Sequence, residues 1–484
     1  MIKHMKFKYF ALVVGAVLVP VTGTAESLLE IYQQALQSDP LIHEADARRL
    51  AASEAAPQAR GALFPQLEAN ARYTTTESSG NRFVTQFTAD GSLVSGSAPF
   101  DSSTDNEFWD IGLRQTIFRW DQVVGLKQAH KMVAQAEADY EAAQQDLMIR
   151  VATRYFEVLA AEDVLTSIHA DRLAIARQLE QARQRFEVGL IAITDVQESQ
   201  AAHDQSVADE IGAKRSLATA REFLREITGE YVTELSAPSE DFPLISPNPA
   251  DAVSWIDLAM SQNLSVVSSR LGEQVARDEI SFRRTGHYPT LDLVIGRSST
   301  DNTGEFNSVN LDGSRSSGPI IGNSVDDSIS VQLRLPIFTG GRTSSRVREA
   351  VYLHRASREQ LQRVARETER QTRDAYLGVL AEISRVKALA QAVVSSRTAL
   401  EATQAGFDVG TRTIVDVLNS QFALYSAITN YYRSRYAYIG NVLRLKQAAG
   451  SLQIQDLEEI DRWLIGRKPP EQVIAEEEAS AGQS

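Results

Sequence analysis

An internal duplication is the feature that most constrains how this chain folds. Residues 185–196 repeat at residues 406–417 with a constant offset of 221. The matching residues include Phe186 and Phe407, Gly189 and Gly410, and Asp195 and Asp416. The largest change of the offset falls across segments 77–106 and 301–326, which are rich in Gly, Ser, Thr, Asn and Asp, as loops that tolerate length change are. We therefore expect two copies of one structural unit.

The first segment, residues 1–25, has the composition of a secretory signal peptide. Three lysines without an acid precede an apolar run that is too short to cross a membrane as a helix. Small residues lead up to Ala25, so we expect cleavage there and a mature start at Glu26. The chain has no cysteine, and an exported protein without disulfides must be held together by packing or by assembly.

The remaining chain follows the duplication. We expect residues 26–249 to form the first repeat and residues 250–457 to form the second, each with short helices, a β-hairpin and a long helix pair. The hairpins are expected at residues 66–118 and 290–338. Residues 458–484 form a C-terminal segment with an acidic tail, whose composition is typical of disorder.

Each repeat contains a helical pattern of about 65 residues, which corresponds to about 100 Å of helix at 1.5 Å per residue. The apolar positions of the first such helix share one stripe with the spacing of a coiled-coil seam. They are Leu147, Val151, Tyr155, Val158 and Leu165. A stripe of this length cannot be buried inside one globule, so the pattern predicts neighbouring helices that run alongside it.

Four segments alternate apolar and polar residues, as a transmembrane β-strand does. They are residues 66–76, 107–118, 290–296 and 327–338. A half-buried sheet in a soluble protein explains any one of them equally well. Four strands cannot close a membrane barrel, because about eight is the minimum and an edge in lipid leaves backbone groups unpaired. A membrane barrel must therefore be shared between two, three or four chains.

No group of residues indicates an enzyme. The seven histidines are scattered without the spacing of metal ligands, and no glycine-rich phosphate loop is present. We expect no catalytic residue, no metal and no cofactor. The formal charge of −14 argues against nucleic acid as a partner. A trimeric adhesin also combines helices with an outer-membrane barrel, but the internal duplication argues against that class.

Several motifs closely resemble the TolC family of outer-membrane efflux and type I secretion channels. They are residues 33–36, 186–197, 289–293, 335–341 and 409–418. The resemblance implies a mixed α/β membrane protein, a homotrimer with a shared twelve-stranded β-barrel in the cell outer membrane, continued by a long periplasmic α-helical barrel. It implies a passive exit duct of tripartite multidrug efflux pumps or type I secretion, with a periplasmic adaptor protein and an inner-membrane transporter as partners.

The resemblance also implies a gate at the periplasmic end of the helix pairs. Asp416 maps to an acidic ring, while the second ring position is Asn419, which departs from the family. The residues implied to tie the closed state are Gln178, Thr194, Asp195 and Arg412. Phe407 replaces the usual tyrosine and Gln404 the usual glutamate.

Elementary electrostatics makes the implied gate specific. We expect a charge-assisted link between Arg412 and Asp195. Repulsion among the copies of Asp416 is expected to raise the pKa of this carboxyl. Phe407 has no hydroxyl to offer Asp195, so that link is missing or bridged by water. Docking to the adaptor is expected at the tips of the helix pairs, namely Val188, Gly189, Leu190, Val409, Gly410 and Thr411.

Overall fold

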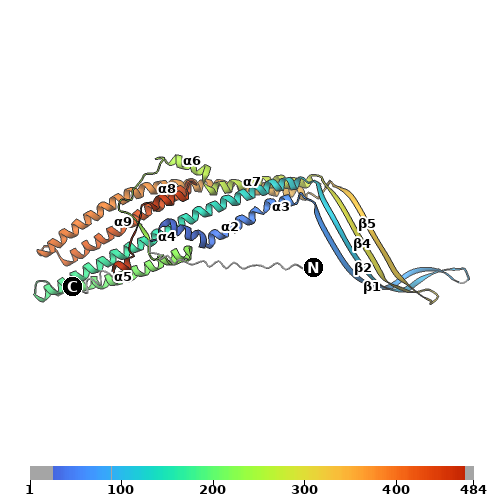
Figure 1. Cartoon of the computed structure of the whole chain (residues 1–484), viewed down its shortest axis with the longest axis horizontal. Helices are drawn as coiled ribbons and strands as arrows, with labels where there is room; N and C mark the ends of the chain where they lie inside the picture. The colour runs from blue at the N-terminus through green and yellow to red at the C-terminus, as the bar shows by residue number, and fades with distance from the viewer. Residues whose placement is uncertain (1–24, 89, 475–484) are drawn as a thin grey trace, which may run out of the picture. The chain divides into compact units, whose positions relative to one another are not determined.

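The computed structural model describes residues 25–88 and 90–474 (Figure 1). The signal peptide expected at residues 1–25 lies outside this part except for Ala25, and so does the acidic tail from residue 475. The described chain forms two compact units. We call residues 25–43, 143–263 and 369–474 the hairpin unit, and residues 44–142 and 264–368 the sheet unit. Each unit combines segments of both sequence repeats.

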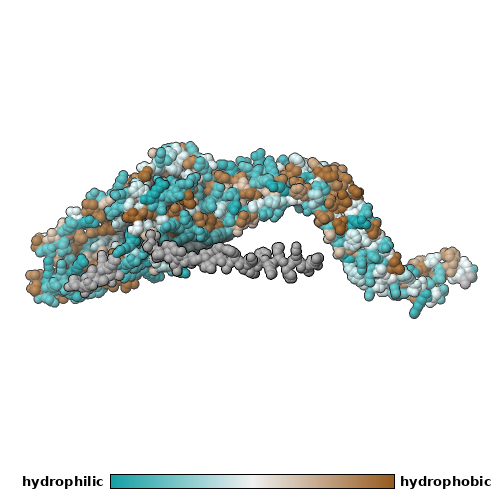
Figure 2. All heavy atoms as spheres, in the orientation of Figure 1, coloured by the Kyte–Doolittle hydropathy of each residue, from teal (hydrophilic) through white to brown (hydrophobic). Residues whose placement is uncertain are grey.

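The sheet unit contains four antiparallel strands in the order β1-β2-β4-β5. They are β1 (Gln66–Phe87), β2 (Leu93–Phe118), β4 (Thr290–Val309) and β5 (Arg315–Arg334). Their register places the predicted apolar residues opposite one another, with Leu67 beside Leu113, Leu113 beside Ile295, and Ile295 beside Ile329. Because side chains alternate between the two faces, this row gives the sheet one apolar face. Figure 2 shows apolar side chains gathered where the strands meet α7 (Leu264–Arg284).

The strands are much longer than the sequence predicted. Segments 77–106 and 301–326, which we expected to be loops, are mostly strand, and β2 alone has 26 residues. The prediction was wrong because polar residues remove the apolar alternation without preventing antiparallel pairing. Side chains also support this ladder, since Asn106 donates a hydrogen bond to Asn302 across β2 and β4 at 2.6 Å.

The last predicted strand also ends earlier than expected. We predicted a strand over residues 327–338, whereas β5 ends at Arg334. Pro336 has no backbone N–H and cannot donate to a ladder, which accounts for the early end. The exposed residues that follow, Ile337 and Phe338, are apolar.

The remaining elements of the sheet unit are helical. They are α3 (Ala55–Gly61), the 3-10 turn η1 (Thr285–His287), most of α2 (Pro40–Ser53), and the first parts of α4 (Trp120–Glu187) and α8 (Arg342–Asp408). Ion pairs join them within the unit. Lys131 of α4 contacts Asp278 of α7 at 2.6 Å, and His354 of α8 contacts Glu273 of α7 at 2.6 Å.

The hairpin unit is built on two long helix pairs. In the first pair α4 turns into α5 (Ile193–Thr228), and in the second α8 turns into α9 (Ile414–Ala449) (Figure 1). Helix α4 has 68 residues and α8 has 67, close to the predicted length. The five residues of the predicted stripe are all buried, at no more than 1% exposed. No helix in the described part of the chain has both the length and the hydropathy needed to cross a membrane.

Short elements surround these pairs. They are α1 (Leu28–Ser38), α6 (Ala252–Gln262), α10 (Ile454–Asp461), and the two-stranded sheet of β3 (Ser236–Pro238) and β6 (Leu464–Gly466). Tyr155, in the buried stripe of α4, donates its hydroxyl hydrogen to the carbonyl of Ser236 at 2.5 Å. The stripe is thereby tied to β3.

Candidate functional site: the tips of the two helix pairs

The two tips are built in the same way. Gly189 and Gly410 have φ angles of 76° and 78°, a left-handed conformation that favours glycine. In each turn the N–H that follows the glycine donates to the carbonyl five residues earlier, at 2.9 Å in the first tip and 2.8 Å in the second. This pattern is a Schellman motif, which stops a helix and reverses the chain tightly.

The residues predicted for docking lie at these turns. Val188, Leu190 and Val409 are 70–75% exposed. Thr411 is exposed as well, and its hydroxyl donates to the carbonyl of Gly406 at 3.0 Å. Each helix pair therefore ends in a tight turn that presents apolar side chains to solvent.

Each tip also has a small apolar core of its own. In the first tip Leu179, Ala182 and Val196 are buried together. In the second tip Phe407 is buried with Ile414 and Val417. The residue that stands in place of the family's tyrosine is thus a core residue of its tip.

Asp416 forms a capping box with Thr413 at the start of α9. Its Oδ2 accepts a hydrogen bond from the backbone N–H of Thr413 at 3.0 Å, and its own N–H donates to the Thr413 hydroxyl at 3.3 Å. The hydrogen bonds from Thr413, followed by the charge of Arg412, lower the pKa of Asp416 within the single chain. Repulsion between copies acts in the opposite direction and stays a prediction about the assembly.

The other predicted gate residues are divided between the tips. Thr194 and Asp195 lie in the first turn of α5, with Thr194 exposed, whereas Arg412 is exposed in the second tip. Within the described chain no hydrogen bond or ion pair joins Arg412 to Asp195. The carbon stem of Arg412 lies instead against Gly406, where an added Cβ would come within 2.8 Å of it.

The remaining three lie along the same helices. Gln178 of α4 is buried, and its amide nitrogen has no hydrogen-bond partner among the described residues. Gln404 of α8 is half-buried, and Asn419 of α9 is exposed, one turn beyond Asp416. No group of three or more His, Cys, Asp or Glu side chains in the described chain is placed to hold a metal ion.

The structure joins the two tips through residues that sequence reasoning missed. Arg185 Nη2 of α4 lies 2.9 Å from Asp408 Oδ1 at the end of α8. The guanidinium of Arg185 also lies over the ring of Phe407, 4.8 Å from its centroid. The signal in the sequence for this ion pair was the opposite charge of Arg185 and Asp408. The two residues do not occupy matched positions of the duplication, so the repeat gave no reason to pair them.

A second charged cluster lies farther along the helices from the tips. Arg221 of α5 contacts Glu162 of α4 at 3.1 Å and Glu471 of the C-terminal segment at 2.6 Å. Burial raises the pKa of Glu162 to about 7, against the opposing effect of Arg221. Arg467 similarly pairs with Asp163. The C-terminal segment is thereby fastened to the first helix pair.

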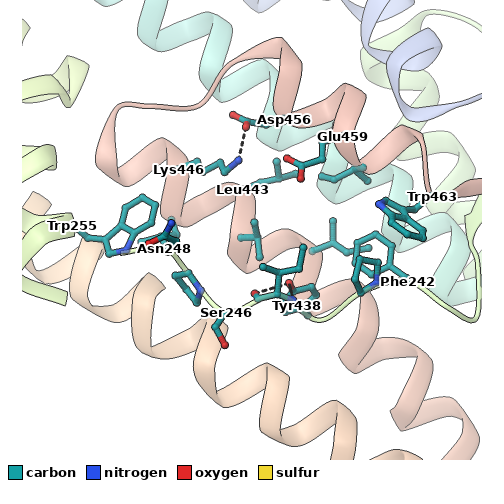
Figure 3. Close-up of a pocket in the computed structure, with 17 residues that line it drawn as sticks. Phe242, Ser246, Asn248, Trp255, Tyr438, Leu443, Lys446, Asp456, Glu459 and Trp463 are labelled. Carbon is teal, nitrogen blue, oxygen red and sulfur yellow. Dashed lines mark hydrogen bonds and ion pairs between the residues drawn. The ribbon is translucent and has the colours of Figure 1, made fainter. Parts of the chain in front are cut away.

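A cavity of about 260 Å³ lies beside α9 and α10 (Figure 3). Its lining is mostly apolar and includes Phe242, Trp255, Tyr438 and Trp463. Lys446, which also lines it, is paired with Asp456 at 2.5 Å. The cavity shows no catalytic arrangement of side chains.

A sheet with one apolar face, joined to helix pairs of this length, is the architecture of an outer-membrane channel. The model of the family described as outer membrane efflux protein matches residues 31–230 and 255–451, and the chain belongs to this family. Its members are channel proteins located in the cell outer membrane, and this chain is an outer-membrane exit duct.

Individual proteins agree with this assignment. The chain is 39% identical over 440 residues to the outer membrane protein TolC of Vibrio cholerae, which covers 91% of this chain and 94% of that protein. It is 28% identical over 453 residues to the alkaline protease secretion protein AprF of Pseudomonas aeruginosa, covering 92% and 89%. The crystal structure of VceC from Vibrio cholerae shares the fold, with a TM-score of 0.65 at 19% identity over 87% of this chain and 96% of that one.

Proposed function

We propose that three copies of this chain close one twelve-stranded barrel in the outer membrane and join their helix pairs into a periplasmic tunnel. The observation that carries this proposal is the sheet itself. Within the described chain β1 and β5 each pair on one side only, and the sheet has an apolar face. Lipid cannot satisfy unpaired backbone groups, so both edges need strands of neighbouring copies.

The duct is a passive route for exported molecules and catalyses no reaction. We propose that it serves tripartite multidrug efflux, type I protein secretion, or both. The family described as outer membrane efflux protein supports efflux, and the likeness to a protein named for protease secretion supports protein export. The two repeats, residues 26–249 and 250–457, would each contribute one strand pair and one helix pair to the assembly.

We place the gate at the tips of the helix pairs. Asp416 would form the acidic ring, and Arg412 would pair with Asp195 of a neighbouring copy. Arg412 is exposed, and its guanidinium makes no hydrogen bond or ion pair with the described residues of its own chain, although its charge acts on Asp416, so it is able to pair with another copy. Thr194, Gln178, Gln404 and Asn419 would line or brace the same constriction.

The tips would also bind the periplasmic adaptor protein, which connects the duct to an inner-membrane transporter. Their exposed apolar side chains, Val188, Leu190 and Val409, support this role, because such residues beside a tight glycine turn form a compact knob that a partner can enclose.

The assembly is tested by native mass spectrometry of the protein purified in detergent. We expect one trimeric species. A stable monomer that carries its own closed barrel would contradict the proposed architecture.

Docking is tested separately, by the substitution Gly410→Asp. We expect loss of export and of cross-linking to the adaptor, with the trimer intact, because aspartate adds a charged side chain to the apolar knob. Gly212→Asp is the control, since Gly212 is exposed in the middle of α5. Equal loss in both variants, or loss of the trimer with Gly410→Asp, would show that the tip is only structural.

A further inference from the structure

Among the described residues, two contacts cross from one tip to the other, and Arg185 makes both. Its guanidinium pairs with the carboxylate of Asp408 at 2.9 Å, and it covers the ring of Phe407 at 4.8 Å from the centroid. Arg185 lies in the last turn of α4, whereas Phe407 and Asp408 close α8. One side chain of the first helix pair therefore holds two consecutive residues of the second.

The position of Phe407 makes this contact consequential. Phe407 is 7% exposed and packs with Ile414 and Val417, so its ring belongs to the core that shapes the second tip. The first tip is packed independently around Leu179 and Ala182. Each tip therefore has a small core of its own. At the tips themselves, the contacts made by Arg185 hold the two cores together.

We propose that Arg185 is a positioning residue of the gate, which clamps the second tip of each chain against the first in the closed state. This inference rests on the proposed location of the gate. Phe407 has no hydroxyl and cannot make a closing hydrogen bond. Arg185 instead holds the face of the Phe407 ring, and it holds the neighbouring Asp408 through its charge.

The two contacts respond differently to conditions. The side chains of Arg185 and Asp408 are 31% and 51% exposed, so their ion pair is screened by salt. The contact with the buried Phe407 ring is shielded from salt more than the ion pair is. An opening motion that separates the tips must break both. Their combined loss should raise the ratio of open to closed states about fivefold per protomer.

The inference is tested by single-channel recording in planar bilayers. We expect Arg185→Gln to raise the open-to-closed ratio by about fivefold or more. Arg183→Gln is the matched control, because Arg183 lies two residues away and donates to Gln200 of its own helix pair at 2.6 Å. We expect the control to change the ratio less than about twofold. An equal effect of both substitutions would overturn the clamp.

A charge exchange separates a specific tie from a general loss of structure. Asp408→Asn should raise the ratio, and adding Arg185→Gln to it should have less effect than in the unaltered protein. The pair Arg185→Glu with Asp408→Arg should recover a closed channel in part, since the ion pair returns while the cation over Phe407 is lost. Additive effects without any recovery would overturn the inference.

The proposed gate and this inference fail in different ways. Arg412→Ser is recorded under the same conditions, because Arg412 belongs to the proposed gate and not to the clamp. If Arg412→Ser opens the channel and Arg185→Gln does not, the clamp alone is wrong. If neither substitution changes the ratio, the gate does not lie at these tips and both proposals are wrong.

Discussion

Gln421 of α9 donates a hydrogen bond from Nε2 to Asp171 Oδ1 of α4 at 2.9 Å, and so joins the two helix pairs behind their tips. Gln421 is buried, and burial raises the pKa of Asp171. Removing the amide leaves a partly buried carboxylate without this donor. We expect Gln421→Ala to lower the free energy of unfolding by about 1–3 kcal/mol.

Thermal unfolding in detergent measures this effect. Gln205→Ala is the control. The exposed Gln205 donates a hydrogen bond to Asp209, which lies one turn farther along the same helix, α5. We expect the control to stay within about 0.5 kcal/mol of the unaltered protein. Equal losses in the two variants would mean that the bond between the helix pairs contributes nothing specific.

Glu162 makes stability depend on pH near neutrality. Burial raises its pKa to about 7, so the folded protein holds this proton more tightly than the unfolded chain does. The resulting stability is present at low pH and is lost as the pH rises through about 7. We expect Glu162→Gln to flatten the pH dependence of the free energy of unfolding between about pH 4.5 and 7, by on the order of 2 kcal/mol. Glu157→Gln, at an exposed position, should leave the dependence unchanged.

Gly450 cannot carry a side chain. Its φ is 75°, and an added Cβ would lie 2.3 Å from the carbonyl oxygen of Gln262. We expect Gly450→Ala to destabilise the protein by more than about 2 kcal/mol and to reduce the yield of folded protein. Gly212→Ala, in the open middle of α5, should instead stabilise it by about 1 kcal/mol. Chemical denaturation compares the two, and a tolerated Gly450→Ala would contradict the structure at this turn.

The apolar face of the sheet is tested by a pair of arginine substitutions. Leu333 lies opposite Leu291 on the apolar face, whereas Arg114 lies on the other face, opposite Gln66. If the apolar face meets lipid, Leu333→Arg should cost about 2–4 kcal/mol near the bilayer midplane. Arg114→Ser should leave assembly intact. Folding yields into lipid vesicles measure both, and equal tolerance would mean that the faces are assigned the wrong way round.

The helices and the strand faces could be read from the sequence because each follows one local period. The buried stripe of α4 and the rung from Leu67 to Ile329 lie where the spacing predicts. The outer halves of the strands could not be read this way. Most of their side chains are polar, and the apolar ones, such as Phe83 and Ile321, are too few to mark a face, so pairing there depends on strands that the inner halves have already aligned.

Contacts between the two helix pairs could not be predicted from the sequence, for a different reason. Gln200 and Gln421 are matched in the duplication, yet Gln200 bonds to Arg183 in its own pair and Gln421 to Asp171 in the other. Which neighbour each residue meets is decided by how the two helix pairs pack against one another. The capping role of Asp416, by contrast, is predictable from the sequence. Thr413 and Asp416 have the spacing of a capping box, which marks the start of a helix.

The sheet that is left unpaired at β1 and at β5 has a genetic consequence in the proposed trimer. One chain with a damaged edge would leave a gap in a barrel whose other two members are sound. In a cell that makes intact and damaged chains in equal amounts and mixes them freely, only about one trimer in eight would contain three intact chains. An edge allele should therefore be dominant, whereas an allele that prevents the chain from folding at all should be recessive.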